Sequence, residues 1–285
     1  MLELALALIL FAAFIHAIWN LLAKRSSESL AFVWWLYSLG AVGYGLAVLP
    51  VTGIYLASAS VVPFIISSLA EVGYVLTLTK GYGKGDLSLV YPISRGGAPI
   101  FTIVFAAVLG ERLPLLGFLG ILVSVVGVCS LSLSEVSEAK VSILNRGSTW
   151  AILCAIFIAI YSVSDDVVVT STSPIVYIWW VFLGNALLTL PFVWRSSRVK
   201  SNLRELRLNW KMIIIASLCS LFAYLEILFA LTLTKVSYVV TGRAFSVLIA
   251  AVLGVMFLKE KFGKWRVLGA ALMILGLGII QFLGS

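Results

Sequence analysis

The sequence predicts an all-α membrane protein whose ten membrane-spanning helices form two inverted five-helix repeats. Three observations lead to this fold class: the composition, ten apolar stretches and an internal repeat. Hydrophobic residues make up 62% of the 285 residues, charged residues only 11%, and the mean hydropathy is +1.13. The alternation of polar and apolar residues that barrel strands require is absent. The composition therefore indicates a polytopic helical membrane protein.

Ten stretches of the chain are apolar enough for a spanning helix, which needs about 20 residues. They cover 2–23, 30–51, 60–79, 87–109, 114–134, 149–170, 174–194, 211–234, 237–258 and 267–283. The first stretch is not expected to be a cleaved signal peptide, because it begins with Glu3 and its apolar run is too long. Cys129, Cys154 and Cys219 lie inside these stretches, so no disulfide framework is expected.

The third observation is that the segment EVGYVLTLTK at 71–80 returns as EILFALTLTK at 226–235, with six identical positions and a leading glutamate in both copies. At an offset near 145, the Trp34–Trp35 pair matches Trp179–Trp180. We therefore predict two repeats, residues 1–140 and residues 141–285. Five helices per repeat is an odd number, so the second repeat enters the membrane from the opposite side, as in many secondary transporters.

The basic residues predict the orientation. Sixteen Lys and Arg residues fall in the odd-numbered loops and two in the even-numbered loops. By the positive-inside rule the odd loops face the cytoplasm, which places both termini outside a plasma (inner) membrane. This distribution explains the net charge of +8 without nucleic acid as a partner. The cluster from 195 to 211 is interpreted as an inside anchor that contacts anionic lipids.

Four charged residues inside helices are the main site candidates. A charge near the bilayer centre costs roughly 2.5–3.5 kcal/mol on insertion scales. Helix lengths place Glu71 and Arg95 at one shared depth and Glu226 and Arg243 at another, both near the midplane. They are interpreted either as two buried ion pairs that fix helix packing, or as a site in which the arginines bind an anionic group and the glutamates an ammonium or a proton.

Further candidates surround these charges. Asp165 matches Asn20 in the repeat and is expected to face the interior, whereas Asp166 is expected at the interface. His16 is expected to be a packed polar residue, and Gly96 and Gly97 either expose carbonyls beside Arg95 or allow close packing. The tryptophans are interpreted as cavity walls or as interfacial residues. The predicted substrate-binding residues are Glu71, Arg95, Glu226, Arg243, Asp165, Asn20, Tyr91, Trp35 and Trp180.

Several motifs resemble one known family. HAIWNLLAKRS at 16–26, YPISRGGAP at 91–99, LGERLPLLGFLGILVSVVGV at 109–128 and LKEKFGKWRVLGAALMILGLGI at 258–279 are similar to EamA-type transporters of the drug/metabolite transporter superfamily. The resemblance implies a ten-helix carrier that works by alternating access, with its cavity mainly between the third, fourth, eighth and ninth helices. The ninth helix lacks counterparts of Pro92 and Pro99, which leaves equivalent bending of the two halves open.

The expected function is secondary transport, as an exporter or exchanger, of a small polar or zwitterionic metabolite such as an amino acid. No phosphate-binding loop of the ATPase type is present, so a proton gradient or exchange is expected to drive it. A flippase for lipids or lipid-linked precursors is the alternative, and an intramembrane enzyme is disfavoured by the single histidine. No cofactor or metal is expected. The glycines of the fifth and tenth helices indicate either a homodimer or packing of the two halves within one chain.

Overall fold

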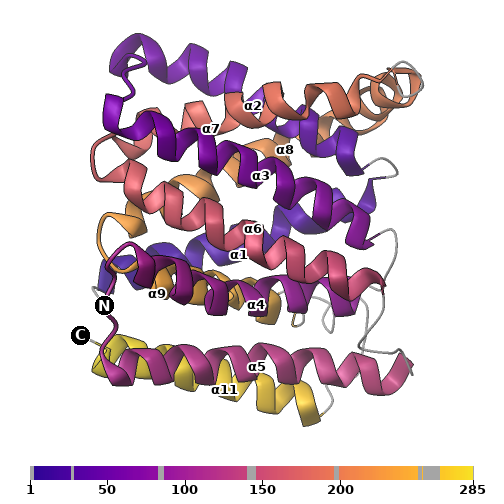
Figure 1. Ribbon diagram of the computed structural model, residues 1–285. Helices are drawn as coiled ribbons and strands as arrows, with labels where there is room; N and C mark the ends of the chain where they lie inside the picture. The colour runs from indigo at the N-terminus through magenta and orange to yellow at the C-terminus, as the bar shows by residue number, and fades with distance from the viewer. Residues whose placement is uncertain are drawn as a thin grey trace.

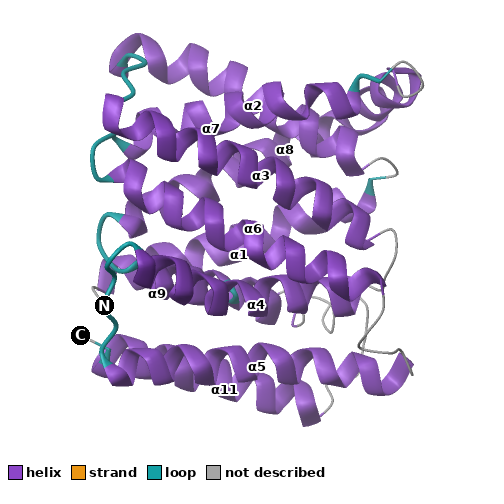
Figure 2. Ribbon diagram, in the orientation of Figure 1, coloured by secondary structure: helices purple, strands orange, loops and turns teal. Residues whose placement is uncertain are grey.

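The computed structural model describes residues 3–26, 29–82, 87–139, 146–195, 199–249, 252 and 264–284. Within these residues the chain is helical and contains no strand, as Figure 2 shows. The elements are α1 (Glu3–Arg25), α2 (Ser29–Thr52), the 3-10 helix η1 (Ser58–Ser60), α3 (Val61–Tyr82), α4 (Leu87–Val108), α5 (Leu115–Ala139), α6 (Arg146–Val169), α7 (Pro174–Val193), α8 (Val199–Leu231), α9 (Val236–Arg243) and α11 (Lys264–Leu283).

The helices have the lengths and surfaces of membrane spans. Six described helices are long and apolar enough to cross a bilayer, and four shorter apolar stretches accompany them. Large side chains such as Leu46, Val108 and Phe282 are more than three-quarters exposed on the outside of the bundle. Lipid is the solvent in which such exposure carries no penalty. The prediction of an all-helical, multi-pass membrane protein is confirmed for the described residues.

Figure 1 shows the helices side by side, with α5 and α11 as a separate pair at one edge and both chain termini at the same end of the molecule. The strongest packing joins α5 with α11, α3 with α6, α1 with α8, and α4 with α6. At the opposite edge α2 packs on α7. The interior of the molecule is therefore lined by α1, α3, α4, α6, α8 and α9.

The contact between α2 and α7 is reciprocal. The Trp34 indole Nε1 donates to the Ala186 carbonyl at 2.9 Å, and the Trp179 Nε1 donates to the Ala41 carbonyl at 3.1 Å. Both the two tryptophans and the two alanines are 145 positions apart in the chain. Each helix therefore gives its partner the same bond that it receives, as the two sides of an isologous interface do.

The contact between α5 and α11 is reciprocal in the same way. A Cβ added to Gly120 would lie 2.8 Å from the Gly276 carbonyl oxygen, and one added to Gly276 would lie 2.6 Å from the Gly120 oxygen. In the same way, a Cβ added to Gly127 would lie 2.8 Å from the Gly269 carbonyl oxygen, and one added to Gly269 would lie 2.7 Å from the Gly127 oxygen. These glycines are thus covered within one chain. The homodimer stays a prediction, and it would have to use other faces of α5 and α11.

Two helices differ from their predicted form. The spanning stretch predicted at 211–234 belongs to a helix that already begins at Val199, and a non-helical residue, Asn209, separates its two parts. The prolines and glycines of α4 do not interrupt its helix, whereas α9 ends at Arg243 and the helix resumes at 245. Gly96 and Gly97 instead admit Val128 of α5 and Ala155 of α6, which supports the packing interpretation.

Candidate functional site

Five polar residues from five helices gather in the interior, and we call them the central cluster. They are His16 on α1, Glu71 on α3, Arg95 on α4, Asp165 on α6 and Arg243 at the end of α9. Glu71 and Asp165 are 2% exposed, Arg95 4% and Arg243 8%. Charged groups this deeply buried require partners, because an isolated charge in a low-dielectric interior costs several kcal/mol.

Arg95 is held by residues of two other helices. Its Nη2 lies 2.5 Å from the His16 Nε2 on α1 and donates to the Tyr74 hydroxyl on α3 at 3.1 Å. The guanidinium also lies over the Tyr74 ring, 5.6 Å from its centroid. Arginine binds in this way through its planar fork, by hydrogen bonds at the edge and by cation–π contact at the face.

The histidine in this group lies between two hydrogen-bond donors. His16 Nε2 faces the Arg95 guanidinium, and His16 Nδ1 lies 2.9 Å from the Trp19 indole nitrogen. A neutral imidazole has a single acceptor nitrogen, so its tautomer decides which of the two donors it accepts from. His16 thus joins α1 to Arg95 of α4.

Glu71 is held by an amide. The Asn185 side chain on α7 donates its Nδ2 to Glu71 Oε2, and the same Nδ2 donates to the Val181 carbonyl at 3.0 Å. Asn185 is fully buried, and its Oδ1 has no hydrogen-bond partner. Glu71 is thus bound to the second half of the chain.

Asp165 is held by three hydroxyl groups from three helices. Ser67 on α3 and Tyr177 on α7 donate to Oδ1 at 2.5 and 2.6 Å, and Tyr224 on α8 donates to Oδ2 at 2.5 Å. A carboxylate with this many donors is well compensated for its burial. Asp165 therefore ties α3, α6, α7 and α8 together beside Glu71.

Arg243 lies over two tyrosine rings of the interior. Its guanidinium lies 5.6 Å from the centroid of the Tyr161 ring and 5.8 Å from that of the Tyr224 ring. The Tyr161 ring in turn packs against the Tyr74 ring that Arg95 covers, with the two centroids 5.9 Å apart. The two arginines thus flank the same space from α4 and α9, while the two carboxylates lie on α3 and α6.

The predicted Glu–Arg pairs stay predictions. The hydrogen bonds described for Arg95 go to His16 and Tyr74, and that of Glu71 goes to Asn185. Glu226 is half-buried, its Oε2 has no hydrogen-bond partner, and no contact with Arg243 is seen for the described side chains. Shared depth was the only basis for these pairs, and it does not fix the face of the helix to which a side chain points.

Three other predicted site residues lie away from the central cluster or bind locally. The Asn20 Nδ2 donates to the backbone oxygen of His16 on its own helix at 2.7 Å. The Trp35 indole donates to the Asn202 carbonyl at 3.3 Å and the Trp180 indole to the Ile54 carbonyl at 3.2 Å, so both anchor helix ends. The side chain of Tyr91 lies outside the described residues.

Sequence reasoning missed the neutral partners of the charges: Tyr74, Tyr161, Tyr177, Asn185 and Tyr224. One of them carried a usable signal. An amide in the middle of an apolar helix, as Asn185 is in 174–194, is costly for the same reason as a carboxylate. The tyrosines gave no such signal, because they are common in membrane proteins at interfaces.

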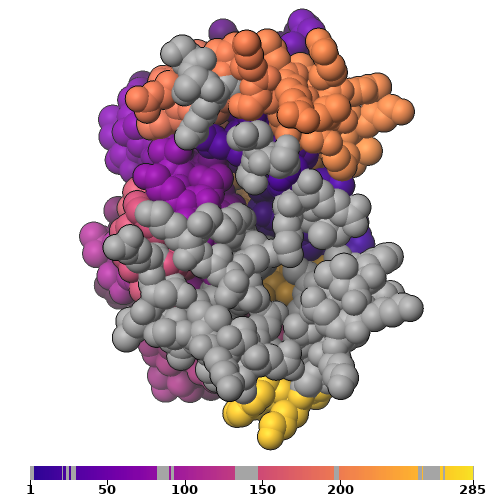
Figure 3. All heavy atoms as spheres, turned by 90° about the vertical axis from the view of Figure 1, so that its right-hand side faces the viewer, coloured from indigo at the N-terminus to yellow at the C-terminus, as the bar shows by residue number. Residues whose placement is uncertain are grey.

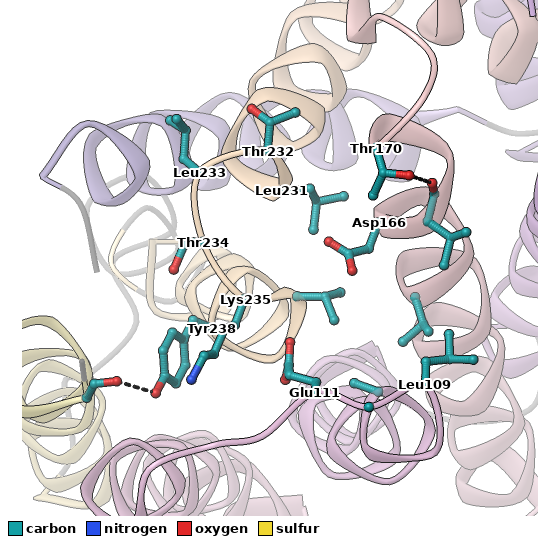
Figure 4. Close-up of a pocket in the computed structure, with 16 residues that line it drawn as sticks. Leu109, Glu111, Asp166, Thr170, Leu231, Thr232, Leu233, Thr234, Lys235 and Tyr238 are labelled. Carbon is teal, nitrogen blue, oxygen red and sulfur yellow. Dashed lines mark hydrogen bonds between the residues drawn. The ribbon is translucent and has the colours of Figure 1, made fainter. Parts of the chain in front are cut away.

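A pocket of about 760 Å³ opens at the end of the molecule that holds the termini. Its walls are the ends of α4, α6 and α8 and the start of α9. Figure 4 shows the carboxylates of Glu111 and Asp166 pointing into it from opposite sides. Ser237 donates to Glu111, and Lys235 donates to the Arg112 carbonyl at 2.7 Å. Asp166, expected at the interface, thus lines this pocket one residue from Asp165.

Among the described residues, no three His, Cys, Asp or Glu side chains are grouped closely enough to hold a metal ion. The chemistry of the central cluster is therefore that of charge pairing and hydrogen bonding. Ionisable groups gathered inside a multi-pass helical bundle are typical of sites that bind a substrate or an ion.

Comparison with known proteins gives a family match in the second half of the chain. Residues 145–282 match the model of the EamA-like transporter family, which is part of the drug/metabolite transporter superfamily. A solved structure described only as "Crystal structure of protein" aligns with a TM-score of 0.77 at 16% identity, covering 98% of this chain and 96% of that one, which supports the fold. No curated protein matches the chain. The family match supports a membrane transporter of this superfamily's type.

Proposed function

We propose that the protein is a secondary transporter that exports or exchanges a small zwitterionic metabolite, such as a neutral amino acid, by alternating access. The observation that carries the proposal is the burial of two arginines and two carboxylates from four helices in the central cluster. Arg95, Arg243, Glu71 and Asp165 are all 8% exposed or less. Ionisable groups inside a membrane protein normally serve a substrate or an ion.

The charge of the central cluster supports a zwitterion in particular. Arg95 and Arg243 balance Glu71 and Asp165, while Glu226 stands apart. A balanced site disfavours ligands with a net charge, since each unmatched charge costs several kcal/mol in such surroundings. The substrate carboxylate binds on the side of Arg95 and His16. Its ammonium group binds on the side of Glu71.

Two inverted repeats, residues 1–140 and 141–285, are part of this proposal. The exchanged bonds of Trp34 and Trp179, and the exchanged glycine contacts between α5 and α11, support a pseudo-twofold axis between the halves. The pairings of α3 with α6 and of α8 with α1 follow the same rule. Movement of one half against the other then opens the central cluster to each end in turn.

The pocket beside Asp166 is the opening at one end of this path. The positive-inside rule makes that end the outside of the plasma membrane, and a proton gradient or exchange drives the cycle. We expect a cysteine placed at 203 to be shielded from impermeant thiol reagents in intact cells, and a cysteine placed at 284 to be labelled. The opposite labelling pattern would show that the protein has the reverse orientation in the membrane. It would not contradict the proposed binding site.

The substrate is tested in liposomes that contain the purified protein. We expect exchange of labelled neutral amino acids, and little exchange of dianionic phosphates or of the corresponding amines without a carboxylate. Arg95→Gln should lower the exchange rate by about a hundredfold, since a lost pair of charge-assisted bonds is worth about 3 kcal/mol. Arg112→Gln, an exposed arginine at the pocket end, is the matched control and should leave it unchanged.

Two results would contradict the proposal. Exchange of phosphates without exchange of zwitterions would show that the arginines act alone. Movement of labelled lipid between leaflets, without exchange of any soluble solute, would support the flippase alternative. The enclosure of the central cluster, with Glu71 and Arg95 at 2% and 4% exposure, favours a small solute over a lipid headgroup with its chains in the bilayer.

A further inference from the structure

The first turns of α8 form a separate amphipathic segment. The helix runs from Val199 to Leu231, but Asn209 has the non-helical angles φ −117° and ψ 15°. Residues 199–208 therefore change direction relative to the apolar span that follows. A short helix of this kind, joined to a membrane span, is placed at the membrane surface rather than across it.

One face of this segment carries Lys200, Arg204 and Arg207, and Lys211 follows just beyond Asn209. The spacing of four and three residues puts the first three on one side of the helix, and we call the four cations the basic stripe. All four side chains are exposed. Large apolar side chains stand among them: Leu203 is 48% exposed, Leu208 62% and Trp210 50%.

The opposite face is fixed to the bundle. Glu205 is 2% exposed and accepts hydrogen bonds at 2.7 Å from Ser26, beyond the end of α1, and from Asn209. The backbone oxygen of Asn202 accepts from the Trp35 indole of α2 at 3.3 Å. These bonds set the rotation of the segment, so the basic stripe points away from the protein.

The basic stripe lies at an edge of the molecule. Figure 3 shows the end opposite to the termini, where the orange residues of α7 and α8 form the upper border of the face. In Figure 1, α2 and α7 lie at the edge farthest from α5 and α11, and the first turns of α8 bind Trp35 of α2. Lipid headgroups surround a membrane protein at such an edge.

We propose that the basic stripe binds the headgroups of anionic phospholipids. Each arginine can donate two parallel hydrogen bonds to phosphate oxygens, and the lysines add positive charge. The exposed Leu203, Leu208 and Trp210 enter the boundary between headgroups and acyl chains. An acidic protein or a nucleic acid would match the charges but would leave these three side chains in water. A membrane surface matches both.

The bound lipid would also hold one end of α1. Glu205 joins the segment to Ser26, and α1 carries His16 of the central cluster. Anionic lipid therefore stabilises the packing of α1 against α8 at this end of the bundle. This consequence concerns stability and does not depend on which substrate the protein transports.

The test measures lipid retention by native mass spectrometry of the purified full-length protein in detergent with phosphatidylglycerol or phosphatidylcholine. We expect phosphatidylglycerol to be retained preferentially. The triple substitution Lys200→Gln, Arg204→Gln and Arg207→Gln should weaken its retention on the order of a hundredfold, since each basic residue near a lipid surface contributes about 1 kcal/mol. The charge-conserving triple Lys200→Arg, Arg204→Lys and Arg207→Lys is the matched control and should retain it.

Other outcomes would overturn the proposal. Equal retention of both lipids, or unchanged retention by the charge-neutral triple, would show that the basic stripe does not select anionic headgroups. Equal competition by free glycerol phosphate would show a phosphate site without a membrane contribution, and preferential binding of an acidic polypeptide would show a protein partner. Should the triple fail to fold, Arg204→Gln and Arg207→Gln alone should each weaken retention about fivefold.

Discussion

Glu71 and Glu226 begin the two copies of the same repeated segment, yet their surroundings differ. Glu71 is 2% exposed and is bound by Asn185 in the interior. Glu226 is half-buried, and its Oε2 has no hydrogen-bond partner. The residue of α8 that reaches the central cluster is Tyr224, which donates to Asp165. Identical residues at matching positions of a repeat therefore need not have the same environment.

The difference has a geometric cause. Side chains two positions apart on a helix point to roughly opposite sides. With Tyr224 directed at Asp165, Glu226 points away from the central cluster. On α3 it is Glu71 itself that faces inward, next to Ser67 one turn earlier. The second half thus presents a phenol where the first presents a carboxylate, and Asp165 on α6 supplies the second negative charge.

Neutralising each glutamate in turn is the most direct test of the difference between Glu71 and Glu226. Glu71→Gln keeps the shape of the side chain but removes the carboxylate that accepts from Asn185. We expect transport in liposomes to fall about a hundredfold, because a hydrogen bond to a charged group is worth up to about 3 kcal/mol. Glu226→Gln should leave both transport and stability nearly unchanged, within about 0.5 kcal/mol. Equal losses of transport in the two variants would contradict this difference and support the symmetric Glu–Arg pairs that the sequence predicted.

Adjacent residues on α6 allow a second comparison. Asp165→Ala leaves the hydroxyls of Ser67, Tyr177 and Tyr224 without their charged acceptor, and we expect the free energy of unfolding to fall by at least about 3 kcal/mol. Asp166→Ala removes a carboxylate from the wall of an open pocket and should change it by less than about 0.5 kcal/mol. Denaturation in detergent micelles measures both. Similar changes in the free energy of unfolding would mean that the bonds of Asp165 do not hold α3, α7 and α8 together.

The smallest expected effect concerns the glycines of α5. A Cβ at Gly120 would lie 2.8 Å from the Gly276 carbonyl oxygen, so Gly120→Ala should destabilise the protein by about 1–3 kcal/mol. Gly43 on α2 has no atom within 4 Å of the added Cβ. Gly43→Ala should therefore stabilise its helix, by up to about 1 kcal/mol. Thermal unfolding of the two variants gives the comparison, and a stabilising Gly120→Ala would mean that α5 and α11 do not pack through these glycines.

Hydropathy was sufficient to predict the positions of most helices, because every spanning segment must bury its own backbone groups. It failed at the start of α8, where charged residues lower the hydropathy of 199–208 although the segment is helical. An amphipathic surface helix is recognised by the side on which its charges lie, as in the spacing of Lys200, Arg204 and Arg207. Counting charges by loop concealed that spacing.

The depths of the central residues could be calculated from the sequence, but their partners could not. Arg95 and Glu71 lie at similar depth, yet Arg95 turns to His16 on α1 and Glu71 to Asn185 on α7. Partner choice depends on the rotation of each helix and on which helices are neighbours. Neither follows from one sequence. The prediction that came nearest was Asp165, chosen from its match to Asn20 and from the fact that adjacent carboxylates on a helix point in different directions.

The exchanged tryptophan bonds between α2 and α7 have a consequence for the conformation that this structure does not represent. If the halves are related by the proposed axis, giving each half the internal conformation of the other produces a second arrangement of the same chain. In that arrangement the bonds of Trp34 and Trp179 trade roles and survive, because each already mirrors the other. The α2–α7 contact would then be the stationary pivot of the cycle, and a crosslink between these two helices should be harmless to transport.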